Sequence, residues 1–147
     1  MNSLLLFSGG SGFLGQSIIP ILKKDFSVTT IGMGATDDIQ SDLSQNIPVL
    51  TGKFSVVIHA AGKAHVVPHN LKESMAFFNI NVDGTKNLCK ALEKDLPKAF
   101  IFISTVAVYG VDAGTEIDET HPLNGSTPYA LSKIDAEQFL TEWCGKH

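Results

Sequence analysis

A tyrosine and a lysine near the end of the chain have the types and spacing of a proton-accepting pair. Tyr129 and Lys133 are four positions apart, so on a helix their side chains lie one turn apart on the same face. A tyrosine with its ordinary pKa of about 10 is a poor base at neutral pH, and a nearby cation favours its phenolate form. Such pairs are common on solvated helix surfaces, so this one is informative only together with other motifs.

Two hydroxyl side chains provide that context. Ser104 and Thr105 follow the run 99–103, which is apolar at every position. A strand of this kind is buried on both faces, and ligands bind beyond the carboxyl ends of such strands in doubly wound folds. We therefore expect Ser104 and Thr105 at a ligand-binding edge.

A glycine-rich turn near the start of the chain is typical of phosphate binding. Gly9, Gly12 and Gly15 lie where an apolar run gives way to a helical pattern. Glycines at this spacing permit a tight turn, a close approach of the backbone to a pyrophosphate and close packing of helix on strand. The position directly after an N-terminal strand favours dinucleotide binding over an ordinary turn.

The elements that must position these residues alternate along the chain. Short apolar runs predict strands, longer amphipathic patterns predict helices, and strands that are apolar on both faces need helices on both sides. The expected strands are 4–7, 28–31, 54–59 and 99–104, and the expected helices are 13–24, 71–95 and 129–143. The sequence thus predicts an α/β fold, a doubly wound parallel sheet of about five strands, as one domain over residues 1–147.

Composition excludes several classes of function. The net charge is −4 and every basic residue other than histidine is a lysine, which argues against nucleic acid as a partner. No apolar run reaches the roughly 20 residues of a membrane span. Cys89 and Cys144 have neither disulfide nor metal spacing, so we expect two reduced thiols, no metal site and a cytoplasmic protein.

Several motifs in order resemble the extended short-chain dehydrogenases, also called the NAD-dependent epimerase/dehydratase family. The matches are Gly9, Gly12 and Gly15 (GxxGxxG), Asp42–Leu43 (the adenine-contacting acid), 59–62 (HxAA), 81–88 (NVxGTxNL) and the catalytic positions Thr105, Tyr129 and Lys133. The resemblance runs through nearly the whole chain. It implies a Rossmann-like domain that binds NAD, with UDP-sugar 4-epimerases as the most similar members.

The resemblance also implies roles for individual residues. Tyr129 takes a sugar hydroxyl proton while NAD takes the hydride, Lys133 lowers the tyrosine pKa and holds the nicotinamide ribose, and Thr105 bonds the reacting oxygen. The implied cofactor-binding residues are Gly9, Ser11, Gly12, Phe13, Leu14, Gly15, Asp42, Leu43, Ala60, Ala61, Gly62, Asn81, Ser104, Tyr129 and Lys133. Lys63 and His65 are candidates for sugar or phosphate contacts, and His59 is expected to be a packed, hydrogen-bonded residue.

The chain departs from the family at the end of the second strand. Members that use NAD carry an acid there, members that prefer NADP often carry arginine, and this chain has 32–34 as Gly-Met-Gly. Either Asp37 or Asp38 reaches the ribose from the loop, or the backbone N–H groups of 32–34 face a phosphate as a nest. We expect NAD, because there is no arginine, without excluding NADP.

The second departure is length. Extended members are about twice as long, so we expect the fold to stop before the sixth strand, with the C-terminal substrate domain absent. The main hypothesis is a nucleotide-sugar epimerase, dehydratase or reductase acting on a UDP-sugar, with 4-epimerase favoured. The alternative is a truncated, non-catalytic NAD(P)-binding module. By analogy with family dimers, a homodimer through helices 71–95 and 129–143 is possible.

Overall fold

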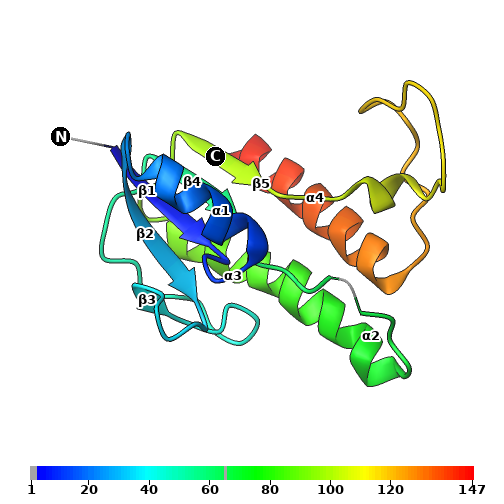
Figure 1. Ribbon diagram of the computed structural model, residues 1–147, viewed down its shortest axis with the longest axis horizontal. Helices are drawn as coiled ribbons and strands as arrows, with labels where there is room; N and C mark the ends of the chain where they lie inside the picture. Colours follow the sequence, from blue (N-terminus) through cyan, green and yellow to red (C-terminus); the bar gives the residue numbers. More distant parts are fainter. Residues whose placement is uncertain (1–2, 65) are drawn as a thin grey trace.

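The sheet has five parallel strands, as a computed structural model that describes residues 3–64 and 66–147 shows (Figure 1). The strands are β1 (Ser3–Ser8), β2 (Phe26–Gly32), β3 (Ile39–Gln40), β4 (Val56–His59) and β5 (Ala99–Phe102). They lie in the order β3-β2-β1-β4-β5. The order reverses at β1, which places a ligand crevice beyond the carboxyl ends of β1 and its neighbours. The predicted doubly wound fold is confirmed, whereas β3 is too short for periodicity to reveal.

Helices cover both faces of the sheet and create two apolar layers. On one face α1 (Phe13–Leu22) packs over Leu5, Phe7 and Ile58. On the other face α3 (Gly84–Leu92) and α4 (Pro128–Lys146) bury a larger cluster. The buried members of that cluster are Leu6, Ile31, Leu43, Phe54, Val57, Leu88, Cys89, Leu92, Leu140 and Trp143. This layering is what the two-faced apolar strands require.

The helix expected over 71–95 is interrupted. It begins as α2 (Leu71–Phe78), where the Asn70 side chain accepts the Glu73 N–H at 2.9 Å as an N-cap. A π-helical turn, η1 (Asn79–Asp83), then joins α2 to α3, which ends at Leu92. The amphipathic pattern predicts the helix but does not reveal this turn. Turns of this kind occur frequently at functional sites.

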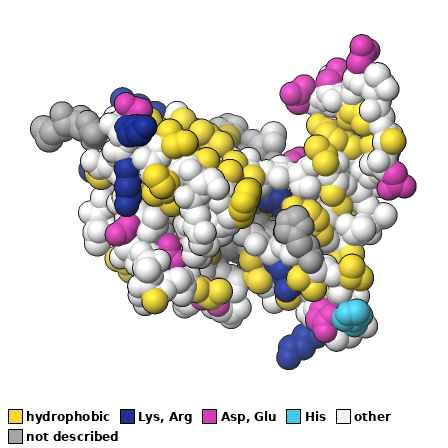
Figure 2. Space-filling model, viewed as in Figure 1, with side chains coloured by type: hydrophobic (Ala, Val, Ile, Leu, Met, Phe, Trp, Pro, Cys, Tyr) yellow, Lys and Arg dark blue, Asp and Glu magenta, His cyan; other side chains and the backbone are white. Residues whose placement is uncertain are grey.

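Strand β5 leaves apolar side chains at the surface. Ile101 and Ile103 are 46% and 37% exposed. Figure 2 shows hydrophobic side chains gathered over the part of this face where α1 and β5 lie. Leu71 and Met75 on α2 and Leu131 on α4 are also exposed. The expected homodimer through these helices stays a prediction.

In residues 3–64 and 66–147, no helix has the length and apolar character to cross a membrane.

The two cysteines are expected to differ sharply in reactivity. Cys89 is buried in the α3 layer, and burial raises its thiol pKa to about 12, whereas Cys144 is exposed on α4. Because only thiolates attack thiol reagents, a native titration with a chromogenic disulfide should detect one thiol, and a titration in denaturant should detect two. A Cys144→Ser chain should show no fast thiol. Rapid labelling of that variant would mean that α3 opens readily.

Candidate functional site

The turn between β1 and α1 is shaped by its glycines. Gly9 has φ +80°, and a Cβ there would lie 2.7 Å from the Ala61 nitrogen. A Cβ on Gly15 would lie 2.5 Å from the Gly10 carbonyl oxygen. The fold itself therefore requires glycine at these two positions. A Cβ on Gly12 would meet only the Gly9 oxygen at 3.3 Å, so the protein's own packing demands much less there.

A cavity of about 460 Å³ lies beyond the carboxyl ends of β1, β2, β3 and β4. It is lined by Gly9, Ser11, Gly12, Gly32, Met33, Gly34, Ser41, Asp42, Leu43, Ser44, His59, Ala60, Ala61, Gly62, Lys63 and Ile80. The N-terminus of α1 begins beside it with Gly12 as N-cap, without a capping side chain or an acid in its first turn. The first N–H groups of a helix and its dipole bind anions. Gly12 has no side chain to fill the space beside this terminus.

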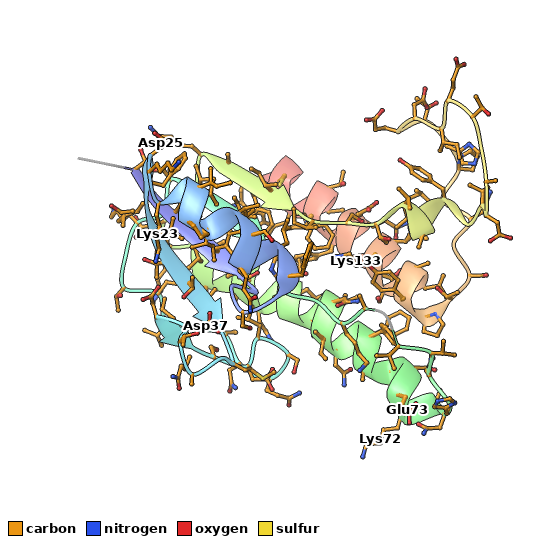
Figure 3. The ribbon with its side chains drawn as sticks, viewed as in Figure 1. Lys23, Asp25, Asp37, Lys72, Glu73 and Lys133 are labelled. Carbon is orange, nitrogen blue, oxygen red and sulfur yellow. The ribbon has the colours of Figure 1, made fainter. Side chains whose placement is uncertain are left out.

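The loop after β2 holds its two aspartates in different places. Asp38 accepts hydrogen bonds from the Thr30 N–H and hydroxyl, at 2.8 and 3.0 Å. Asp37 is 8% exposed, accepts the Gly34 N–H at 2.9 Å, and lies in the loop that follows β2 (Figure 3). A Cβ on Gly32 would lie 2.6 Å from the Asp37 carboxylate. Asp37 therefore places its carboxylate beside the end of β2, where Gly32 has no side chain, and it occupies one N–H of the predicted nest.

Asp42 is held in a fixed orientation in the loop after β3. Its Oδ1 accepts the Ser44 N–H at 2.9 Å and the Ser44 hydroxyl at 2.7 Å. The next carbonyl, that of Leu43, accepts a bond from Asn87 on α3 at 2.7 Å. These contacts fix the loop after β3 so that Asp42 and Leu43 line the cavity, as the sequence motif predicts.

The turn after β4 contains a buried histidine. His59 is 1% exposed, and its ring nitrogens contact the Ser8 hydroxyl at 2.5 Å and the Thr85 hydroxyl at 2.9 Å. Burial, with a smaller contribution from the charge of Lys133, lowers the pKa of His59 to about 3. The side chain is therefore neutral at physiological pH, which agrees with the expected packed, hydrogen-bonded residue. Its neighbour Lys63 also lines the cavity, and His65 lies outside the described residues.

The start of α4 carries the candidate base. Thr127 caps the helix by accepting the Ala130 N–H at 3.1 Å, and Pro128 is at its first turn, so Tyr129 is held in that turn. The Tyr129 ring packs against Phe77 of α2 with the ring centroids 6.1 Å apart. Lys63 in turn lies over Phe77, 5.5 Å from its centroid. This stack connects the tyrosine to a residue of the cavity wall.

Lys133 turns toward β5. Its ammonium donates to the Ile103 carbonyl oxygen at 2.6 Å and lies 3.8 Å from the centroid of the Phe102 ring (Figure 3). Burial lowers the pKa of Lys133 to about 8, opposed by the negative charge of Glu137. Tyr129 and Lys133 thus lie on one helix, as their spacing predicts, but their side chains contact different neighbours.

The two hydroxyl candidates after β5 have local partners. Ser104 donates a hydrogen bond to the Glu137 carboxylate on α4. Thr105 caps the short 3-10 helix η2 (Val106–Tyr109), and its hydroxyl oxygen accepts the Ala107 N–H at 3.2 Å. Both residues follow the carboxyl end of β5, which is where the sequence predicts them.

The cavity divides the predicted cofactor-binding residues into two sets. Those that line it are Gly9, Ser11, Gly12, Asp42, Leu43, Ala60, Ala61 and Gly62. Those outside its lining are Phe13, Leu14, Gly15, Asn81, Ser104, Tyr129 and Lys133. Sequence reasoning missed Ser41, Ser44 and Ile80 in the lining. Ser41 and Ser44 flank Asp42, so an extended search around that motif finds them, whereas no sequence signal marks Ile80.

Comparison with known proteins settles the family. The sequence profile of the NAD dependent epimerase/dehydratase family matches residues 5–147. The chain belongs to this family. N-acetyl-alpha-D-glucosaminyl-diphospho-ditrans,octacis-undecaprenol 4-epimerase of Escherichia coli O157:H7 is 34% identical, over 99% of this chain and 45% of that protein. Human dTDP-D-glucose 4,6-dehydratase is 30% identical, over 95% of this chain and 46% of that protein. The chain spans about half the length of the curated relatives it matches.

Solved structures show the same fold. The UDP-Glc/GlcNAc 4-epimerase of Campylobacter jejuni superposes with a TM-score of 0.82 at 24% identity, over 99% of this chain and 50% of that one. UDP-glucose 4-epimerase from Brucella ovis in complex with NAD superposes with a TM-score of 0.79 at 23% identity, over 97% of this chain and 48% of that one. NAD, the cofactor expected from the sequence, is the cofactor of the epimerase/dehydratase family.

Proposed function

We propose that this chain binds NAD and takes part in hydride transfer at a hydroxyl-bearing carbon of a nucleotide sugar, with epimerisation at C4 as the outcome. The observation that carries the proposal is the cavity in which Gly9, Gly12 and the turn 60–62 surround the open N-terminus of α1. The cavity offers N–H donors for a diphosphate and, in the loop after β3, Asp42 for the adenosine end. A UDP-sugar is the proposed substrate.

Bound NAD supplies the hydride acceptor for this chemistry. Tyr129 takes the proton of the sugar hydroxyl, since a phenolate is a base of suitable strength near neutral pH. Lys133, one turn further along α4, supplies a positive charge that favours the phenolate, although its ammonium is bonded to the Ile103 carbonyl. Thr105 donates a hydrogen bond to the reacting oxygen, and the carbon that loses its hydride becomes a ketone. Return of the hydride to the opposite face of that carbon, with the proton given back by Tyr129, then yields the C4 epimer.

The test compares two tyrosine variants. The sequence has two tyrosines, so Tyr109→Phe is a matched control for Tyr129→Phe. With NAD and either UDP-glucose or UDP-N-acetylglucosamine, we expect Tyr129→Phe to lose about a thousandfold in turnover, within the range for removal of a general base. Its affinity for NAD should be unchanged. Full activity in Tyr129→Phe contradicts the assigned base, whereas NAD binding by the wild type without any turnover favours the non-catalytic module.

The preference for NAD over NADP is expected to depend on Asp37. Its carboxylate lies beside Gly32 and Gly34, which line the cavity, so it repels a 2′-phosphate placed there. We expect Asp37→Asn to lower the NADP dissociation constant relative to the NAD dissociation constant by about tenfold, which corresponds to about 1.4 kcal/mol. Asp38→Asn removes the same charge from the Thr30 side of the loop and should leave the ratio unchanged. Equal effects in the two variants, measured by calorimetric titration, contradict a local role for Asp37.

A further inference from the structure

The π-helical turn between α2 and α3 is held by a side chain outside the helix. In η1 the Gly84 N–H bonds to the Asn79 carbonyl five residues back, so the helix is locally wider. Across this turn the Thr85 hydroxyl donates to the Asn81 carbonyl oxygen at 2.6 Å. Thr85 is completely buried and is also in contact with His59 of β4. The turn is therefore connected directly to the central sheet.

The hydrogen bonds in this connection run in one direction. A carbonyl cannot donate, so Thr85 gives its proton to Asn81 and must accept from the His59 Nε2, 2.9 Å away. Neutral His59 then carries its proton on Nε2 and accepts on Nδ1 from the Ser8 hydroxyl at 2.5 Å. The Ser8 oxygen in turn accepts the Ala61 N–H at 3.1 Å. The chain thus extends from the cavity wall, through β1 and β4, to the π turn.

The Asn81 side chain completes the connection. It is 1% exposed, and its oxygen accepts the Lys63 N–H at 2.7 Å. Its amide nitrogen donates to the Lys63 carbonyl at 3.1 Å and to the Ser132 hydroxyl at 2.9 Å. Ser132 then donates to the Tyr129 carbonyl at 2.8 Å. Both amide protons are used inside the protein, so Asn81 has no donor left for a cofactor.

We infer that Ser8, His59, Thr85 and Asn81 are positioning residues, which hold the turn 60–63 at a fixed place relative to the first turn of α4. The turn 60–63 lines the proposed NAD cavity, and the first turn of α4 carries Tyr129. This inference rests on the proposed function, because the network matters for catalysis only if the cavity holds NAD and Tyr129 is the base. The network itself is defined by hydrogen bonds and does not depend on the chemistry.

The network makes a direct prediction for the wild-type chain. Nitrogen-15 NMR of the histidine rings should show His59 with its proton on Nε2 alone at neutral pH. A proton on Nδ1 overturns the inference, because the Ser8–His59 and His59–Thr85 bonds would then run the other way and Thr85 could no longer donate to the Asn81 carbonyl. This measurement needs neither substrate nor NAD.

Substitution at Thr85 tests the consequence for the site. Thr85→Val keeps the shape and loses the hydroxyl, and Thr85→Ser keeps the hydroxyl. Thr141→Val is the matched control, because the Thr141 hydroxyl donates to the Glu137 carbonyl oxygen of its own helix. We expect Thr85→Val to raise the NAD dissociation constant by about tenfold, as loss of a buried hydrogen bond implies. Its His59 should no longer show the Nε2 proton alone. Thr85→Ser and Thr141→Val should resemble the wild type in both readouts.

The outcomes separate this inference from the proposed function. If Thr85→Val keeps both the wild-type His59 tautomer and an NAD dissociation constant within about twofold, the positioning role is wrong. If Thr85→Val does not fold, failure of Thr85→Ser to restore NAD binding and the Nε2 proton overturns it. If the wild type binds no NAD, the proposed function is wrong, and the His59 tautomer alone then decides whether the network exists.

Discussion

A Gly12→Asp chain is expected to fold like the wild type and to bind NAD at least about a hundredfold more weakly, a loss of roughly 2.7 kcal/mol. The fold tolerates the change because a Cβ on Gly12 would meet only the Gly9 oxygen, at 3.3 Å. The binding site does not tolerate it, because Gly12 lines the cavity at the N-terminus of α1. A carboxylate there fills the space for a diphosphate and places a negative charge against it.

Two further glycine variants distinguish obstruction of the cavity at Gly12 from the effect of an added charge and from a loss of fold stability. Gly145→Asp adds the same charge on α4, where a Cβ would have no neighbour within 4 Å among residues 3–64 and 66–147, and this variant should bind NAD normally. Gly9→Ala should instead destabilise the fold, because its Cβ would lie 2.7 Å from the Ala61 nitrogen at a φ of +80°. Calorimetric titration and thermal unfolding measure both effects. Normal NAD binding by Gly12→Asp would place the cofactor elsewhere.

Acid is expected to destabilise the protein through His59. Its pKa is about 3 in the folded chain and 6.5 in the unfolded chain, because burial opposes its charged form. The unfolded state therefore binds more protons between these values. The contribution of neutral His59 to the free energy of unfolding is fully present above pH 6.5 and is lost as the pH falls toward 3. Well below pH 6.5 the free energy of unfolding should fall by about 1.4 kcal/mol per pH unit from this residue alone.

Urea unfolding at several pH values between 7 and 4 measures this contribution against suitable controls. A His59→Gln chain is less stable at neutral pH, since it loses the bonded ring, but its stability should fall less steeply on acidification than that of the wild type. His69→Gln removes an exposed histidine and should keep the wild-type slope. Equal slopes in the wild type and His59→Gln would mean that His59 is accessible to protons in the folded state.

The sequence by itself determined the fold class and the wall of the site nearest the glycines. Alternation of apolar strands and amphipathic helices is a local property, so it predicts the parallel sheet without knowledge of contacts. The same holds for Gly9 and Gly12, since a strand that ends in such a turn brings the backbone to the ligand-binding edge whatever the rest of the chain does. The resemblance to the family predicts Asp42 as a cofactor-binding residue, and Asp42 lines the cavity in the loop after β3.

The tertiary structure decided the directions of the side chains. Tyr129 and Lys133 share a helix, but packing sends Lys133 to Ile103 on β5 and Tyr129 to Phe77 on α2. Asn81 contacts Lys63 and Ser132, which are 18 and 51 positions away in the chain. Asp37 reaches the end of β2 because of the shape of one loop. A sequence pattern records which residues share an element or a face, whereas the partner of a buried polar group depends on which elements the fold brings together.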